Sequence, residues 1–70
     1  MNVFGYTVKR YLLDNGLKQN HIVENSNMTK ANVSQLLNRD NISLDKMLLI
    51  ADALDCDLEI RLVPRDARKD

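Results

Sequence analysis

Residues 17–39 constrain the fold of this chain more than any other stretch, because they contain two short apolar patterns of helical spacing. The first pattern ends with Ile22 and Val23 on its apolar face. The second has the i, i+3, i+4 spacing of a single helix face and consists of Val33, Leu36 and Leu37. This stretch therefore predicts two short helices that cross through a tight turn.

The turn between these helices is predicted at Ser26 and Asn27. We expect a positive φ at Asn27, because asparagine adopts that conformation more readily than most non-glycine residues. Met28 would fill the inside of the turn, and Thr29 is a favourable N-cap for the helix that follows. Local turn chemistry and the apolar pattern thus predict the same two helices.

This segment resembles the helix-turn-helix of the phage-repressor and Cro family of bacterial DNA-binding proteins, also called the XRE family, over roughly residues 6–55. Gln19 matches the glutamine at the start of the family's motif. The chain departs from the family pattern at Val23, where a small residue is usual, and at Asn27, where glycine is usual. The resemblance implies a lambda-repressor-like DNA-binding domain of four to five helices. The same scaffold also serves as a protein-binding module.

The remaining sequence predicts two further helices. Residues 6–15 carry Val8, Tyr11 and Leu12 on one face, and Asn15-Gly16 is a helix-stop signal. The motif helices then run from about residue 18 to 25 and from 29 to 38. After a polar loop, Ser43 is expected to cap a last helix with Asp45 in its first turn. The predicted inner face of that helix consists of Leu44, Met47, Leu48, Ala51 and Leu54.

The period changes from helical to alternating after Asp55. Residues 57–62 alternate charged with apolar side chains, and Pro64 closes the pattern after Val63, which predicts a β-strand over about residues 57–63. Because a lone strand leaves its backbone groups unpaired, we expect it to pair either with a second copy of the chain or with residues 2–4. The resemblance favours the second copy, because Cro-like proteins dimerise through C-terminal strands.

The strand has a sequence that can pair with itself. With a two-fold axis through Ile60, Leu58 faces Leu62 of the partner subunit, and Glu59 faces Arg61 of the partner subunit. A shift of one residue would mix apolar with charged neighbours. The predicted dimer interface is therefore Leu58, Glu59, Ile60, Arg61 and Leu62.

The length of 70 residues indicates one domain, residues 1–64, followed by a charged tail at residues 65–70. A core of this size is close to the smallest that is stable alone, which also favours a homodimer.

His21 and the single cysteine, Cys56, have no partners at metal-ligand spacing, and no catalytic pair stands out. We therefore expect no metal, no cofactor and no enzymatic activity. With no signal-peptide pattern or membrane-length apolar run, a cytoplasmic location away from membranes is expected.

The formal net charge is zero, which is not the usual footprint of a nucleic-acid-binding protein. The charges are segregated, however. Residues 17–39 contain Lys18, Lys30 and Arg39 against Glu24, whereas residues 40–59 are mostly acidic. A basic half beside an acidic half could approach double-stranded DNA in one orientation only.

By motif position, the resemblance implies that the second motif helix reads bases in the major groove. The base-reading residues would be Lys30, Ala31, Ser34 and Gln35. Phosphate contacts or positioning would come from Lys18, Gln19, Thr29, Asn32, Asn38, Arg39 and Ser43. The alternative is that these polar residues only solvate the outer surface.

Two functions follow from the sequence. The first is a dimeric transcriptional repressor that occupies a pseudo-palindromic operator. The second is an antitoxin-like or regulatory module that binds a protein partner, such as a toxin or an antirepressor, through the same fold or through its acidic last helix. Affinity for DNA that falls steeply with salt would favour the first function over the second.

Overall fold

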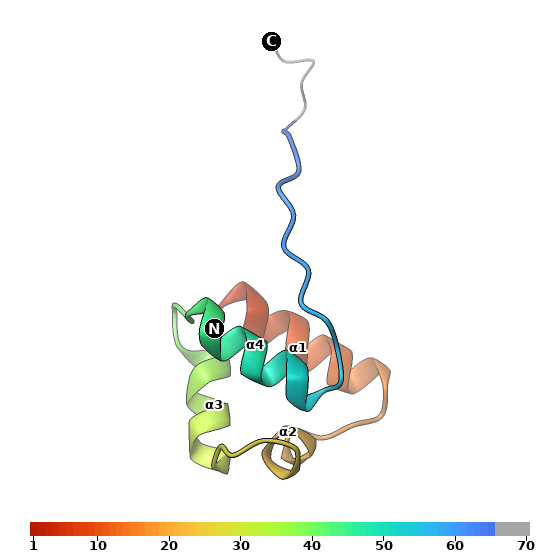
Figure 1. The fold of residues 1–70 in the computed structure, drawn as a ribbon, viewed down its shortest axis with the longest axis vertical. Coiled ribbons are helices and arrows are strands. Elements are labelled where there is room, and N and C mark those ends of the chain that lie inside the picture. The colour runs from red at the N-terminus through yellow and green to blue at the C-terminus, as the bar shows by residue number, and fades with distance from the viewer. Residues whose placement is uncertain (66–70) are drawn as a thin grey trace.

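A computed structural model describes residues 1–65 of the chain. This part contains the helices α1 (Val3–Asp14), α2 (Asn20–Glu24), α3 (Lys30–Asn38) and α4 (Leu44–Ala53), arranged as Figure 1 shows. Helix α1 packs against α3, and α2 packs against both α3 and α4. The mainly helical fold predicted from the sequence is confirmed.

The core takes apolar side chains from all four helices. Ile22 of α2, Val33 and Leu37 of α3 and Ile50 of α4 are completely buried. Val8 and Leu12 of α1 pack into the same cluster. The apolar positions predicted for α2 and α3 are therefore core positions, and this core fixes α3 relative to the other helices.

Side-chain caps define the start of α3 and α4. The Thr29 hydroxyl accepts a hydrogen bond from the Asn32 backbone N–H at 3.1 Å, and the Ser43 hydroxyl accepts one from the Lys46 N–H at 3.4 Å. Helix α1 ends at Asp14, and Gly16, just after the C-cap Asn15, has a φ of 64°, the left-handed conformation that favours glycine. All three cap predictions are confirmed.

The first helix begins earlier than the sequence pattern predicts. It starts at Val3 rather than at Tyr6, because Asn2 caps it. The Asn2 side chain accepts a hydrogen bond from the Gly5 N–H and donates bonds to the carbonyls of Leu36, at 3.0 Å, and Arg39, at 2.9 Å. Residues 2–4 therefore cannot be the strand partner that the sequence left open.

Gly5 permits the closest contact between α1 and α3. A Cβ atom at this position would lie 2.0 Å from the Leu37 carbonyl oxygen. Any side chain would force the two backbones apart. The glycine and the buried Asn2 therefore lock the N-terminus of α1 onto the C-terminal half of α3.

The turn between α2 and α3 differs from the prediction. Among residues 1–65, Asp55 is the only non-glycine residue with positive φ, so the positive φ expected at Asn27 is wrong. Residues 25–29 separate the two helices, and the Ser26 hydroxyl supports the loop by accepting a hydrogen bond from the Met28 N–H at 3.2 Å. A connection of this length can reverse the chain without left-handed backbone.

The inner face of α4 also differs in part. Ala51 and Leu54 are buried as predicted, but Leu44 and Leu48 are each 48% exposed. Ile50 and Ala53 are buried in their place, in the core cluster that also contains Ile22 of α2, and the predicted Met47 is half-buried. The inner face predicted for α4 from its apolar pattern is therefore rotated about the helix axis from the face that is buried in the structure.

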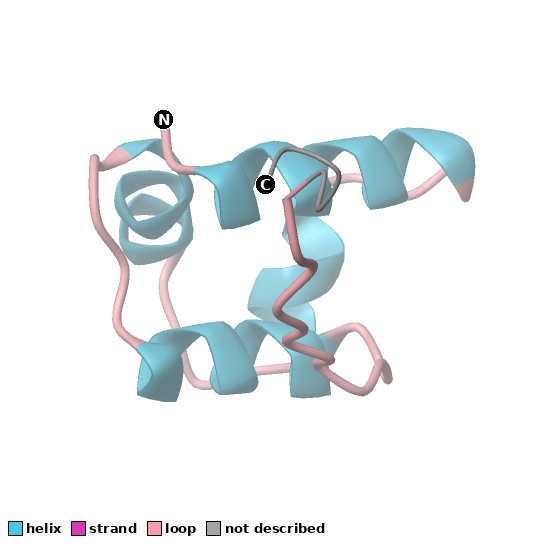
Figure 2. Cartoon of the chain, turned by 90° about the horizontal axis from the view of Figure 1, so that it is seen from above, coloured by secondary structure: helices cyan, strands magenta, loops and turns pink. Residues whose placement is uncertain are grey.

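No strand forms within residues 1–65, so the predicted strand at residues 57–63 is not present in the single chain (Figure 2). Residues 57–65 instead form an irregular segment that extends away from the helices (Figure 1). The physical reason is that a strand requires a second strand for its backbone hydrogen bonds. Most of the predicted tail, residues 66–70, lies outside the described residues.

Candidate nucleic-acid interface

The face of α3 opposite the core is polar and accessible. At about 100° per residue, Ala31, Gln35 and Asn38 lie along the centre of this face, and all three are exposed. Lys30, which is exposed, and Ser34, which is half-buried, flank the centre on one side. The four residues predicted to read bases therefore lie together on one outward surface of α3.

Both ends of α3 are held in place by side chains. Thr29 caps its N-terminus, and the Asn2 amide binds the carbonyls of Leu36 and Arg39 at its C-terminus. These bonds satisfy backbone groups that a helix end would otherwise leave without partners. Helix α3 is therefore presented to solvent with backbone groups at both of its ends bound to side chains.

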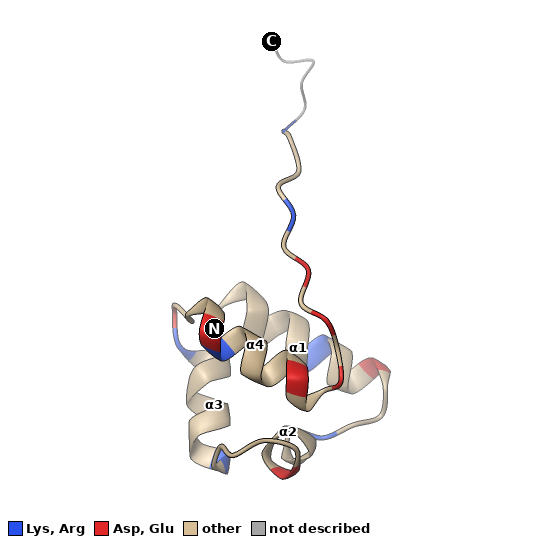
Figure 3. Cartoon of the chain, in the orientation of Figure 1, with Lys and Arg blue, Asp and Glu red and all other residues tan. Residues whose placement is uncertain are grey.

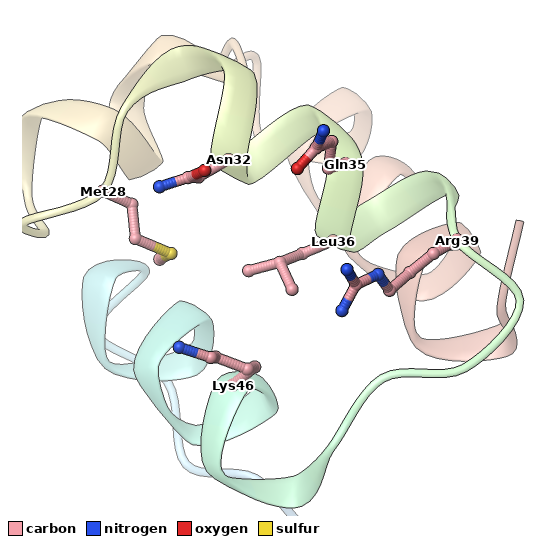
Figure 4. Close-up of a pocket in the computed structure, with 6 residues that line it drawn as sticks. All are labelled: Met28, Asn32, Gln35, Leu36, Arg39 and Lys46. Carbon is pink, nitrogen blue, oxygen red and sulfur yellow. The ribbon is translucent and has the colours of Figure 1, made fainter.

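A hollow of about 210 Å³ lies between α3 and the first turn of α4. Figure 4 shows Asn32, Gln35 and Arg39 on its α3 side, Lys46 on the facing α4 side and Leu36 between them. Two predicted phosphate contacts, Asn32 and Arg39, are thus brought together at this hollow. Lys46 joins them, although it lies within the mostly acidic residues 40–59.

Lys9 is a second basic residue that reaches this region from outside the helix-turn-helix motif. Its ammonium donates a hydrogen bond to the Asn38 side-chain carbonyl at 3.3 Å. Asn38 in turn donates from its amide to the Ser34 carbonyl at 2.8 Å. No local sequence signal points to Lys9 or Lys46, because each reaches α3 from another helix.

The other predicted phosphate contacts lie at helix starts. Thr29 and Ser43 use their hydroxyls as helix caps, so their oxygens are already engaged. Gln19 precedes α2 and makes no capping hydrogen bond, and Lys18 is exposed beside it. The side chains of Lys18 and Gln19 are therefore available to an external group, whereas the two caps contribute mainly by fixing the backbone.

The basic groups around α3 are not neutralised within the described chain. The one ion pair of residues 1–65 joins Arg10 to Asp14 across 3.5 Å, away from Lys30, Arg39 and Lys46. Figure 3 shows basic residues at both ends of α3, with acidic residues beside those at its C-terminal end, and further acidic residues at the end of α4 and along the start of the C-terminal segment. The charge segregation read from the sequence thus persists only in part, because Asp40 follows Arg39 and Asp45 precedes Lys46.

The residues predicted for a dimer interface lie on the extended segment. Leu58 is half-buried, whereas Glu59, Ile60, Arg61 and Leu62 are exposed.

In the part of the chain that the structure describes, no three histidine, cysteine or acidic side chains gather where they could bind a metal. None of the helices described there has the length and apolarity needed to cross a membrane.

The chain was compared with known proteins. Residues 4–63 match the family model described as a helix-turn-helix domain. No curated protein and no solved structure matches the chain. The match covers α1 to α4 and includes the interface around α3, and it indicates a DNA-binding regulator. The chain belongs to the helix-turn-helix domain family.

Proposed function

We propose that this protein is a dimeric, sequence-specific transcriptional repressor of the phage-repressor and Cro type. The observation that carries the proposal is the outward face of α3, which is held at both ends by side-chain hydrogen bonds, accessible and bordered by basic side chains. A helix presented in this way fits the major groove of B-DNA. Occupation of an operator by the protein would then block access to a promoter.

The proposed base readers are Lys30, Ala31, Ser34 and Gln35. Lys30 can donate to guanine O6 and N7, and Gln35 can make a bidentate contact with adenine. The Ala31 methyl group can contact a thymine methyl group. Gln35 is the strongest candidate, because it is exposed near the centre of the outward face.

The proposed phosphate contacts surround this face. Lys18 and Gln19 would bind one stretch of backbone at the start of α2, and Arg39 with Asn32 would bind another beside the hollow. Phosphate contacts set the orientation of a protein on the duplex without reading sequence. Further positioning would come from Thr29, Asn38 and Ser43.

The proposed dimer forms when residues 57–63 of two chains pair as antiparallel strands about a two-fold axis at Ile60. The segment is extended and unpaired in the single chain, as such an exchange requires. Two subunits could then place their α3 helices in half-sites about one DNA turn, roughly 34 Å, apart. The operator would accordingly be a pseudo-palindrome.

A protein-interaction module is the second candidate function. It is favoured by the exposed apolar side chains of the extended segment, which include Leu62 at 98% exposure and Val63 at 74%. A toxin or an antirepressor could bind this segment as an added strand. Affinity for such a partner would depend little on salt, whereas DNA affinity would fall steeply with it.

Selection of bound fragments from random duplex DNA would identify the operator and test the proposal. Replacing Gln35 with Ala should then cost about 1–3 kcal/mol per half-site and relax the preference at one base pair. As the matched control, Lys18→Ala should weaken binding to all sequences alike. An unchanged base preference in the Gln35→Ala protein would remove Gln35 from the base readers, and the absence of any duplex binding would contradict the function itself.

A further inference from the structure

A groove opens between α1 and α4, beside the point where the C-terminal segment leaves the helices. Its volume is about 290 Å³. A cavity of about 150 Å³ with an aliphatic lining is already large enough for benzene. The groove is lined mainly by apolar residues, among them Phe4, Val8, Tyr11, Ala51, Leu54 and Leu58. It can therefore hold a large aliphatic side chain.

The C-terminal segment carries such side chains on the side that faces this groove. Cys56 and Leu58 are half-buried at its edge, and Cys56 raises the pKa of the neighbouring Tyr11 hydroxyl. In extended chain, Ile60 and Leu62 project to the same side as Leu58, but they are 66% and 98% exposed. Their apolar surface has no partner on the chain's own helices.

The sequence of the segment disfavours a tight turn back into its own groove. Residues 58–63 contain no glycine, proline or asparagine, the residues that most readily form a tight turn. A return of Leu62 to the groove beside Leu58 would need such a turn. A second chain can supply the same side chain without one.

We propose that the groove of each subunit receives Leu62 of the partner subunit. The proposal rests on the paired strands of the proposed dimer. In an antiparallel pair centred on Ile60, Leu62 of the partner subunit lies directly opposite Leu58, and both side chains project from the same face. Because Leu58 lines the groove, this register directs the partner's Leu62 into it.

Charge complementarity selects the same register. Glu59 and Arg61 are both exposed and project from the opposite face of the segment. Centring the pair on Ile60 places Glu59 opposite Arg61 of the partner subunit twice, on the side away from the groove. The second copy of this chain thus matches the apolar face and the two central charged pairs of the segment, whereas Val63 lies opposite Asp57 of the partner subunit at its ends.

A cysteine cross-link tests this register directly. Pro64 would lie opposite Cys56 of the partner subunit, with Cα atoms about 4.5–5.5 Å apart, within the range that a disulfide spans. Pro64→Cys should therefore form a covalent dimer under mild oxidation, seen on a non-reducing gel. The wild-type protein should not, because the two Cys56 residues would be offset by eight positions, roughly 27 Å. Val63→Cys is the matched control, because its side chain projects to the other face.

A second measurement tests the groove itself. Leu62→Ala should weaken self-association at least about tenfold in sedimentation equilibrium, whereas Val63→Ala should change it by less than about twofold. Neither position contacts the helical core, so both variants should keep the wild-type helix content.

The outcomes separate this inference from the proposed function. If the wild-type protein is a dimer but the Pro64→Cys variant forms no cross-link, the groove assignment is overturned. DNA binding by a dimer would then still stand. A monomer at micromolar concentration would overturn both the groove assignment and the dimer. A specific cross-link in a protein that does not bind any duplex DNA would support the groove and contradict the repressor function.

Discussion

Asn2 offers the sharpest test of how α3 is held. Its side chain caps α1 and also donates hydrogen bonds to the carbonyls of Leu36 and Arg39. Loss of an N-cap costs about 1 kcal/mol, and each of the two inter-helix bonds contributes about 1 kcal/mol. Asn2→Ala should therefore lower the free energy of unfolding by about 3 kcal/mol. A core of this size supplies only about 3–5 kcal/mol in total, so the variant should be close to unfolded.

A second substitution at the same position separates the two roles of Asn2. Asn2→Ser keeps an N-cap oxygen but removes both donors, so it should cost about 2 of the 3 kcal/mol. Urea unfolding followed by far-ultraviolet circular dichroism would measure both variants. In thermal unfolding, the Asn2→Ala midpoint should fall by roughly 12–24 °C, at about 4–8 °C per kcal/mol.

Asn41→Ala is the matched control, because Asn41 is exposed and its side chain makes no hydrogen bond within residues 1–65. Its effect should stay below about 0.5 kcal/mol. A cost of less than about 1 kcal/mol for Asn2→Ala would contradict the combined capping and bridging role of this side chain. If Asn2→Ser is as stable as the wild type, the bridge to α3 contributes nothing and only the cap matters.

Three further predictions concern packing, DNA affinity and assembly. Gly5→Ala should destabilise the fold by at least about 1–3 kcal/mol in urea unfolding, because the new methyl group would collide with the Leu37 carbonyl; an unchanged midpoint would contradict the close approach. Lys46→Ala should weaken DNA binding to all sequences and reduce the salt slope by about one, and an unchanged slope would place Lys46 away from the phosphates. Glu59→Lys should weaken self-association in sedimentation, and adding Arg61→Glu should restore it; failure of the double variant to recover would refute the register.

The sequence alone determined the features that depend on neighbouring residues. The apolar faces of α2 and α3 and the caps at Thr29 and Ser43 were predicted correctly, because helix periodicity and capping act over three or four residues. Gly16 ended α1 for the same local reason. The outward set on α3 also followed from the sequence, since residues opposite a buried face must point to solvent.

Only the tertiary structure decided the features that join distant segments. Asn2 binds residues 36 and 39, and no local pattern distinguishes it from the other asparagines of the chain. Lys9 and Lys46 reach the surroundings of α3 from α1 and α4, which requires knowledge of how the helices pack. The buried side of α4 was likewise decided by packing into the shared core, because apolar residues occupy most positions of α4 and its pattern alone does not select one face.

The C-terminal segment shows the same division most clearly. Its alternating side chains were read from the sequence, and its extended backbone agrees with them. Whether it is a strand is not a property of one chain, because a strand exists only when its backbone groups find partners. Local chemistry therefore determined the helices and their exposed faces. Packing between elements decided which distant residues meet around α3. The same packing left residues 57–63 without a partner strand in the single chain.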